Sequence, residues 1–159
     1  MTDAVRYDVL PLGEVAKLSG KEALQAIADG RLPQPPIAKT MTFRLVEIGD
    51  GFAAFEGETG QHLLNPLGSV HGGWALTLID SATGCAGLSL LPAGSSFTTI
   101  ETKANLTRPI LVDTGRVRCE AKVASQGRQI ISAEAWVRDA EGKLLAHGTS
   151  TLMVINPRA

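Results

Sequence analysis

The most informative segment of this chain reads Asn65-Pro66-Leu67-Gly68-Ser69-Val70-His71-Gly72-Gly73-Trp74-Ala75-Leu76-Thr77-Leu78-Ile79-Asp80. It predicts an apolar helix that begins with two glycines, Gly72 and Gly73, and carries one carboxylate, Asp80. The first N–H groups of a helix have no intrahelical partner and the dipole is positive there, so glycines let an anion approach closely. An ionised carboxylate in apolar surroundings is costly unless donors satisfy it or chemistry uses it. The segment therefore predicts an electrophilic helix start and a base.

The composition fits one compact domain with a sizeable core. The chain has 159 residues, of which 15 are Lys or Arg and 16 are Asp or Glu. This near-neutral balance gives no global field that would attract nucleic acid or an anionic membrane, so neither is expected as a partner. Cys85 and Cys119 have no CxxC spacing, which predicts buried thiols without a disulfide in a reducing compartment. The chain begins without a signal-peptide pattern and its one long apolar stretch contains Asp80, so a cytoplasmic protein is expected.

Residues 1–38 are predicted to form an N-terminal extension, and residues 39–159 the main domain. Ser19-Gly20-Lys21-Glu22 is typical of a capping box, and the apolar residues after it form one stripe of a short amphipathic helix that ends at Gly30. In Leu32-Pro33-Gln34-Pro35-Pro36, each proline fixes its own φ and biases the preceding residue away from the helix. This segment is therefore expected to be an extended link between the short helix and the main domain.

The main domain is predicted to have antiparallel strands both before and after the apolar helix in the chain. Phe43, Leu45, Phe52 and Phe55 flank Gly49-Asp50-Gly51, which predicts a hairpin. Further strands, joined as a meander, are predicted where apolar and polar residues alternate, over 100–107, 116–123, 131–137 and 144–154. The inner face of the first of these is expected to carry Ile100, Thr102, Ala104 and Leu106. Small inner residues let a curved sheet wrap closely around one helix, and they are Ala104, Ala121, Ala133, Ala135 and Ala146.

One long helix between a hairpin and several strands, with His-Gly-Gly at its start, resembles the hotdog-fold thioesterase superfamily in its phenylacetate-pathway (PaaI-like) type. The motifs that carry the resemblance are Gly30-Arg31-Leu32-Pro33-Gln34-Pro35-Pro36, Asn65, His71-Gly72-Gly73, Asp80, Thr99-Ile100-Glu101, Arg108-Pro109 and Gln126-Gly127-Arg128. The resemblance implies an α+β hotdog fold, in which an antiparallel curved sheet wraps around one central helix. It also implies hydrolysis of an acyl-CoA, without a cofactor, by a homo-oligomer that is a dimer at minimum and a tetramer in the family.

Helix geometry indicates that one chain cannot aim both ends of the key segment at one carbonyl. Nine residues at about 1.5 Å each separate His71 from Asp80 by roughly 13 Å, and about 100° per residue places them on nearly opposite faces. If Gly72 and Asp80 serve the same thioester, two antiparallel helices must pass each other across a two-fold axis. A dimer with a shared site is therefore expected, and the resemblance implies the same.

Asp80 is interpreted as the general base or the nucleophile, and the amides of Gly72 and Gly73 as the oxyanion site. The alternative for Asp80 is a partly buried acid that is hydrogen-bonded to Ser81 or Thr83. The alternative for the glycines is close packing of a neighbouring chain, which is compatible with an oxyanion site.

Three further residues have candidate roles near the helix start. His71 is interpreted as positioning the loop and the helix, since His62 and His147 lie outside metal-ligand spacing and no metal site is expected. Asn65 either shapes a turn or holds the attacking water or the thioester. Thr99 is either a plain strand residue or one whose hydroxyl reaches the partner's site.

Arg108 and Arg128 are either solvated loop charges or ligands of the coenzyme A phosphates, and Arg128, in its glycine turn, fits the second role better. Trp74 departs from the family, where smaller residues are common, and is expected to narrow the pocket beside the helix start.

The absence of GxSxG, GxGxxG and Walker motifs argues against a serine hydrolase, a dinucleotide enzyme and a nucleotide triphosphatase. The acyl group, aryl or medium-chain aliphatic, stays open. So do two alternatives to hydrolysis, a non-catalytic acyl-CoA binding or sensing module and a hotdog dehydratase or hydratase.

Overall fold

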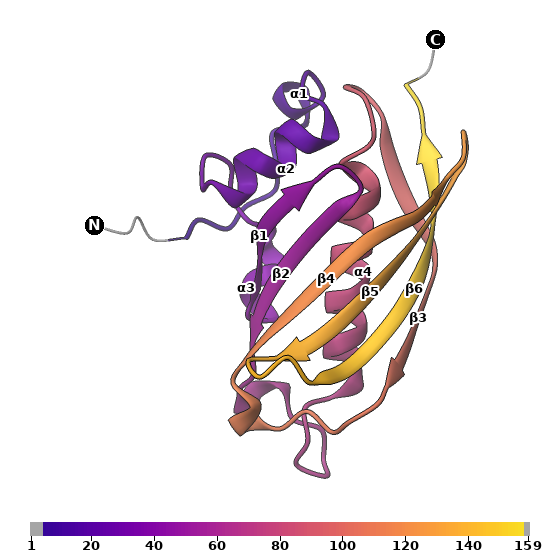
Figure 1. The fold of residues 1–159 in the computed structure, drawn as a ribbon. Coiled ribbons are helices and arrows are strands. Elements are labelled where there is room, and N and C mark those ends of the chain that lie inside the picture. The colour runs from indigo at the N-terminus through magenta and orange to yellow at the C-terminus, as the bar shows by residue number, and fades with distance from the viewer. Residues whose placement is uncertain (1–4, 158–159) are drawn as a thin grey trace.

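In the computed structural model, which describes residues 5–157, six strands form one antiparallel sheet that curves around a long helix, α4 (Gly72–Leu88) (Figure 1). The strands are β1 (Phe43–Gly49), β2 (Phe52–Glu58), β3 (Ser96–Leu106), β4 (Arg116–Gln126), β5 (Ile130–Asp139) and β6 (Leu144–Ile155). Their order across the sheet is β1-β2-β4-β5-β6-β3. Two 3-10 helices, η1 (Gln61–Leu63) and η2 (Val112–Thr114), lie in the loops before α4 and β4. This is the hotdog arrangement that the sequence predicts.

Most strand pairings follow from turns that the sequence identifies. β1 and β2 form the predicted hairpin around Gly49-Asp50-Gly51, where Gly51 has a φ of +66°. β4, β5 and β6 pair in chain order through short loops. The prediction of a continuous meander is wrong for β3, which pairs with β6, while β2 pairs with β4. β3 is therefore an edge strand of the sheet.

The alternation predicted for β3 is interrupted by a β-bulge. The register against β6 shifts between Thr99 and Glu101, so the side chains on the two sides of the bulge do not alternate as one series. Thr102 is half-buried, but Ile100 and Leu106 are 57% and 53% exposed. The prediction that Ile100 lies on the inner face is therefore wrong, whereas Leu106 lies on the same side of the strand as Thr102 and contacts the start of α4, although it is exposed.

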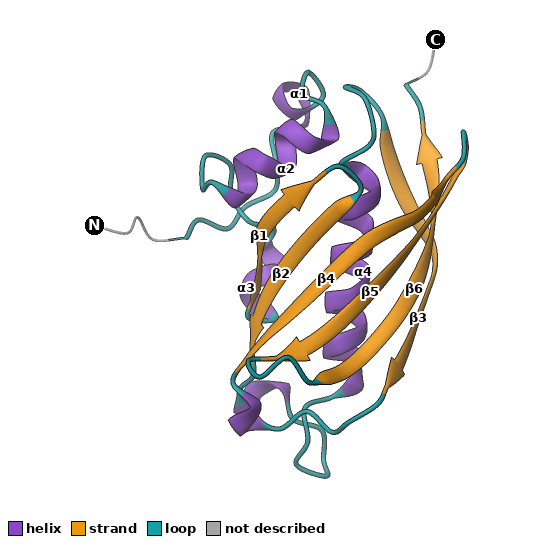
Figure 2. Ribbon diagram, viewed as in Figure 1, coloured by secondary structure: helices purple, strands orange, loops and turns teal. Residues whose placement is uncertain are grey.

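The N-terminal extension folds as three short helices, α1 (Leu12–Val15), α2 (Gly20–Ala28) and α3 (Pro36–Thr40) (Figure 2). The predicted capping box is present, because Glu22 N–H donates to Ser19 Oγ and Ser19 N–H donates to the Glu22 carboxylate. α2 ends before Gly30, whose φ is +76°. The sequence did not predict α3, in which Pro36 occupies the first turn, where a missing N–H loses no hydrogen bond. The boundary after residue 38 falls inside α3 and stays a prediction.

The extension covers the edge of the sheet at β1. The buried side chain of Gln34 donates from Nε2 to Leu45 O and accepts from Leu45 N–H at Oε1, both at 3.1 Å. The backbone of Gln34 meanwhile pairs with Tyr7 in a parallel bridge, in which Gln34 N–H donates to Arg6 O at 2.9 Å. One side chain thus satisfies β1 where a neighbouring strand would otherwise pair.

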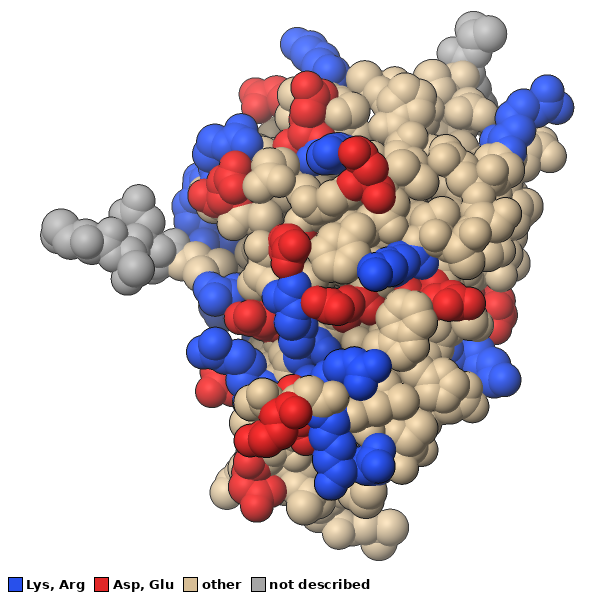
Figure 3. All heavy atoms as spheres, in the orientation of Figure 1, with Lys and Arg blue, Asp and Glu red and all other residues tan. Residues whose placement is uncertain are grey.

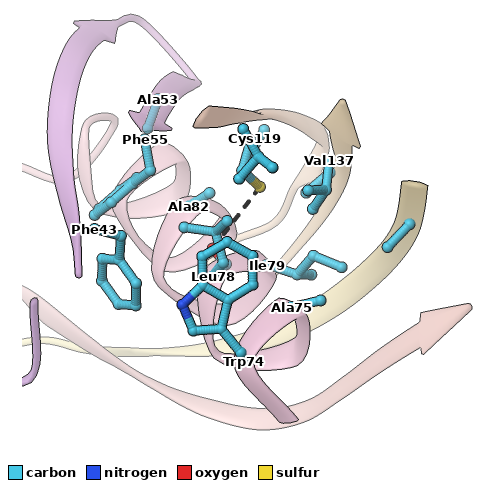
Figure 4. Packing of buried hydrophobic residues seen from close by; sticks show 14 of the residues in the cluster. Phe43, Ala53, Phe55, Trp74, Ala75, Leu78, Ile79, Ala82, Cys119 and Val137 are labelled. Carbon is cyan, nitrogen blue, oxygen red and sulfur yellow. Dashed lines mark hydrogen bonds between the residues drawn. The ribbon is translucent and has the colours of Figure 1, made fainter. Parts of the chain in front are cut away.

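The core lies between α4 and the sheet. The small inner residues of β4, β5 and β6 are buried as predicted, and they are Ala121, Ala133, Ala135 and Ala146. Trp74 also belongs to this core, and Figure 4 shows its indole extending from α4 among the buried side chains. Its Nε1 donates to Met41 O at 2.7 Å, and a Cβ at Gly57 would lie 2.8 Å from the ring. The expectation that Trp74 narrows the pocket at the helix start is wrong, because the ring points into the core.

Among residues 5–157, no helix combines the length and apolar character that crossing a bilayer requires.

Candidate active site

His71 caps α4 and thereby determines which backbone amide is free there. His71 Nδ1 accepts from Gly73 N–H and His71 O accepts from Trp74 N–H, both at 2.9 Å. Since Nδ1 is an acceptor, the imidazole carries its proton on Nε2. Gly72 N–H has no hydrogen-bond partner within residues 5–157. The free electrophilic amide at this helix start is therefore that of Gly72, and Gly73 is occupied by the cap.

Asn65 organises the loop that leads to α4. Its Oδ1 accepts from Leu67 N–H at 2.9 Å and from Ser69 N–H at 3.3 Å, while its Nδ2 donates to Ser69 Oγ at 2.8 Å. The loop closes through Asn65 N–H, which donates to Ser69 O at 2.8 Å. Asn65 thus shapes the turn, which is one of the two roles that the sequence left open. The amide has two hydrogens on Nδ2, so one stays available for a ligand.

A pocket of about 340 Å³ opens beside the helix start. Asn65, Gly72 and Arg108 line it together with the apolar side chain of Leu106. The exposed Arg108 donates from Nη1 to Leu144 O at 2.7 Å, which ties its guanidinium to the start of β6. A Cβ at position 72 would lie 2.6 Å from Leu106 Cδ1, so only glycine leaves Leu106 this close to the free amide. The structure therefore brings three of the sequence-predicted site residues together in one pocket.

Asp80 lies half-buried in the middle of α4, with one hydrogen-bond donor on its carboxylate. Thr102 Oγ1 donates to Asp80 Oδ1 at 2.8 Å. In the described part of the chain, the carboxylate has no other hydrogen-bond donor and no ion pair, and Oδ2 is therefore free to accept. The predicted alternative donors do not serve it, since Thr83 Oγ1 contacts the main-chain oxygen of Asp80 instead, at 3.1 Å. Sequence reasoning missed Thr102, although the strand alternation had placed it on the inner face.

β3 runs along α4 and follows it from the helix start to beyond its centre. Leu106 contacts the position of Gly72, Thr102 contacts Asp80, and Phe97 contacts the position of Gly84, where a Cβ would lie 2.7 Å from the ring. Thr99 is half-buried on this strand between Phe97 and Thr102. The helix flank that carries Asp80 therefore lies beside the edge strand of the sheet.

A single chain keeps the two ends of the candidate site apart. Gly72 and Asp80 lie on one helix, and eight residues correspond to about 12 Å along the axis. Arg128 lies further away, in the turn between β4 and β5, where the neighbouring Gln129 O accepts from Val154 N–H. Figure 1 shows this turn and the start of α4 at opposite ends of the molecule. Within one subunit, the structure does not bring Asp80 or Arg128 to the pocket at Gly72.

The two thiols are not poised as nucleophiles. Cys85 and Cys119 are both free, as the sequence predicts. Burial and, to a lesser extent, the charge of Asp80 raise the pKa of the Cys85 thiol to about 12. Burial also raises the pKa of the Cys119 thiol above its usual range. Because the thiolate is the nucleophile, Asp80 is the candidate reactive side chain of α4.

Charges of both signs mix on the face of the molecule shown in Figure 3. In one cluster, the Arg118 guanidinium contacts Glu120 at 2.8 Å and also pairs with Glu47 and Glu56. Hydrogen bonds from Arg118 to Glu120 and to Glu47 raise the pKa of the guanidinium. Since acidic partners already occupy it, Arg118 is a poor candidate for binding phosphate. Over residues 5–157, no three His, Cys, Asp or Glu side chains group so as to hold a metal ion.

Comparison with known proteins identifies the family. The family described as "Thioesterase superfamily" matches residues 67–146, which is half of the chain and includes Gly72, Asp80 and Arg108. The chain therefore belongs to the thioesterase superfamily.

Individual relatives agree with this membership. A Haemophilus influenzae protein named "Putative esterase" is 32% identical over 93 residues, which are 58% of this chain and 66%, just under two thirds, of that protein. The structure of a conserved protein from Pseudomonas aeruginosa has a TM-score of 0.70 and 33% identity, over 76% of this chain and 94% of that one. A mutant of the phenylacetic acid degradation protein PaaI from Thermus thermophilus has a TM-score of 0.67 and 26% identity, over 74% and 97%. The resemblance to PaaI-like hotdog thioesterases is confirmed.

Proposed function

We propose that this protein hydrolyses an acyl-CoA thioester to the free acid and coenzyme A. The observation that carries the proposal is found on one helix of the described residues 5–157, where the Gly72 amide at the start and Asp80 Oδ2 in the middle have no hydrogen-bond partner. The amide can stabilise the oxyanion that forms from a thioester carbonyl. The carboxylate can take a proton from water or attack the carbonyl directly. Membership of the thioesterase superfamily supports this reaction.

The reaction requires at least a homodimer, because about 12 Å separate Gly72 from Asp80 along the helix. The partner subunit supplies Asp80 to the thioester that is bound at Gly72. β3 supports this arrangement, since it is an edge strand of 11 residues that runs beside α4. Antiparallel pairing of two β3 strands continues the sheet and carries the two α4 helices past each other in opposite directions. A tetramer made of two such dimers, as the PaaI-like resemblance implies, belongs to the proposal.

The remaining site residues bind and orient the substrate. Asn65 offers its free Nδ2 hydrogen to the thioester or to the attacking water, and His71 holds the helix start in place. Thr99 reaches the partner's site from β3. Arg108, at the pocket, and Arg128, brought to the pocket from the partner subunit, bind the phosphates of coenzyme A.

The acyl group is an aryl or a medium-chain aliphatic group, and the chemistry needs no cofactor because a carboxylate and a backbone amide supply the base and the oxyanion site. The two free thiols suit a reducing compartment, and we place the protein in the cytoplasm on that ground.

Release of free thiol from a panel of aryl and aliphatic acyl-CoAs tests the proposal. We expect turnover of at least one acyl class by the parent protein and loss of that turnover in Asp80→Asn. Tight binding of acyl-CoA without thiol release would instead identify a binding or sensing module. Conversion of an enoyl-CoA without thiol release would identify a hydratase.

A further inference from the structure

Behind Asp80, three hydroxyl groups form one continuous chain of hydrogen bonds. Thr102 Oγ1 lies 2.8 Å from Asp80 Oδ1, Ser150 Oγ lies 3.0 Å from Thr102 Oγ1, and Thr83 Oγ1 lies 2.7 Å from Ser150 Oγ. The three residues come from β3, β6 and α4. Thr83 and Ser150 are 0% and 1% exposed. Because water does not reach these two hydroxyls, other protein groups must supply their hydrogen-bond partners.

The charge of Asp80 sets the direction of every proton in this chain. An ionised carboxylate only accepts, so Thr102 must donate its single hydroxyl proton to Asp80. Ser150 must then donate to Thr102, and Thr83 must donate to Ser150. In the opposite direction, Thr83 would donate to Ile79 O, which lies 2.9 Å away, and Thr102 would face the carboxylate without a proton. Hydroxyls that donate in sequence polarise one another, which strengthens the last bond to Asp80.

Backbone features bring Thr102 to this position. The β-bulge between Thr99 and Glu101 shifts the alternation of β3, so that Thr99 and Thr102 are both half-buried while Thr102 faces α4. Gly148 on β6 permits β3 and α4 to approach β6 closely. A Cβ at this position would lie 2.2 Å from Lys103 O and 3.1 Å from the side chain of Ile79. The hydroxyl of Thr102 is therefore held by the sheet and not by a flexible loop.

We propose that Thr102 is a positioning residue for thioester hydrolysis, with Ser150 and Thr83 as its support. It fixes Asp80 Oδ1 and leaves Oδ2 as the oxygen that reacts. When Asp80 acts as a base, the water oxygen bonds to the carbonyl carbon while a water proton moves to Oδ2. The C–S bond then breaks and the thiolate of coenzyme A leaves, and the three hydroxyls keep all their protons. This inference rests on the proposed function.

Replacement of Thr102 by valine tests the inference, because valine keeps the shape and removes the hydroxyl. We expect kcat to fall by about tenfold to a hundredfold, as for other residues that orient a reacting group. KM for the acyl-CoA stays unchanged, because Thr102 contacts the carboxylate and not the substrate. Thr102→Ser, which keeps a hydroxyl, retains most of kcat. Thr98→Val is the matched control on the same strand, since Thr98 is exposed and, in the described part of the chain, Thr102 is the threonine of β3 that donates to Asp80.

Ser150→Ala removes the second hydroxyl and is expected to lower kcat less than Thr102→Val does, because Thr102 still has its proton for Asp80. A stability cycle checks the hydrogen bond without any assay of activity. Thr102→Val should lower Tm more in the parent protein than in an Asp80→Ala background, where the acceptor is already missing. Equal losses of Tm in the two backgrounds would mean that the bond to Asp80 is not formed.

The outcomes separate this inference from the proposed function. Turnover that is lost in Asp80→Asn but kept in Thr102→Val overturns the role of Thr102 alone. Equal loss of kcat in Thr102→Val and Thr102→Ser also overturns it, since packing and not the hydroxyl would then matter. Absence of turnover in the parent protein overturns the proposed function and the role of Thr102 together.

Discussion

The two edges of the sheet differ in whether other parts of the chain cover them. At β1, the buried Gln34 side chain bonds both the N–H and the C=O of Leu45, and helices α2 and α3 pack beside the strand. At β3, the 11-residue strand pairs with β6 on one side only, and Ile100 and Leu106 are more than half exposed. A long edge strand with free backbone groups is a template for another strand, whereas a covered edge is not. Of the two edges, within residues 5–157, only β3 therefore leaves its outer side open to a further strand.

The candidate site lies along the open edge. Thr102 and Leu106 of β3 contact Asp80 and the position of Gly72, whereas helices α2 and α3 of the extension pack mainly against β1. A partner that pairs with β3 therefore adds atoms beside the site, while a change at β1 alters only the scaffold. This difference predicts that substitutions at the two edges have different consequences, in activity at β3 and in stability at β1.

The largest effect is expected at the reactive group beside the open edge. Asp80→Asn is nearly isosteric and should lower kcat by at least about a hundredfold, because a general base or nucleophile is lost. Binding of acyl-CoA and Tm should change little. Retention of most of the turnover would show that Asp80 does not carry the reaction.

Hybrid dimers sharpen this test. Gly72→Val places a side chain against Leu106 at the free amide, so it should inactivate the other half of the site. After equal mixing and subunit exchange with Asp80→Asn, half of the dimers are hybrids and each has one intact site, so about a quarter of the parent activity should return. If verified exchange restores nothing, each chain works alone and the role of β3 in sharing the site is wrong.

The next effect is expected at the exposed apolar residue of the open edge. Ile100→Asp would bury an unpaired charge between two β3 strands, which should raise the dissociation constant of the dimer by at least about a hundredfold. Activity per chain should then fall with dilution in parallel with the dimer fraction measured by analytical ultracentrifugation. A fully active monomer would show that strand pairing at β3 is not needed for activity. Val9→Asp, at another exposed apolar residue, is the control in the extension.

At the covered edge the expected loss is one of stability. Gln34→Ala leaves Leu45 N–H and C=O without their partner, which should lower the free energy of unfolding by about 2 kcal/mol. Chemical denaturation measures this change, and Gln61→Ala is the control at an exposed glutamine. The folded variant should keep its kcat, because β1 lies across the sheet from β3. A loss of kcat in a fully folded variant would show that the β1 edge also contributes to activity.

Local features of the fold could be predicted from the sequence. The capping box of Ser19 and Glu22, the hairpin at Gly49-Asp50-Gly51 and the helix start at Gly72 each depend on residues that are close in the chain. The hotdog architecture followed from their order and from the motifs that carry the resemblance. In the capping box, the hairpin and the helix start, residues that are close in the chain make the contacts that determine the local structure.

The remaining features depend on partners that are distant in the chain. The alternation of β3 placed Thr102 on the inner face, but its contact with Asp80 depends on the position of β3 beside β6 and α4, which has no local signal. Gln34 lies in a proline-rich segment whose extended form was predicted, but its partner Leu45 was not. Trp74 was assigned to the pocket because of its position in sequence, whereas Gly57 on β2 makes room for its ring in the core. Tertiary packing decided each of these.

The smallest effect is expected at Arg128, which lies far from the pocket in its own chain. If antiparallel pairing of β3 brings Arg128 to the partner's pocket, Arg128→Ala should raise KM for an acyl-CoA severalfold and leave an acyl-pantetheine, which lacks the nucleotide phosphates, almost unaffected. Arg31→Ala, on the extension, is the matched control and should change neither KM. Exposed ion contacts are screened by salt, so KM for the acyl-CoA should rise with ionic strength more steeply in the parent protein than in the variant. Equal losses on both substrates would assign Arg128 to the structure of its turn, and the phosphate contact would then fall to Arg108, which already lines the pocket beside Gly72.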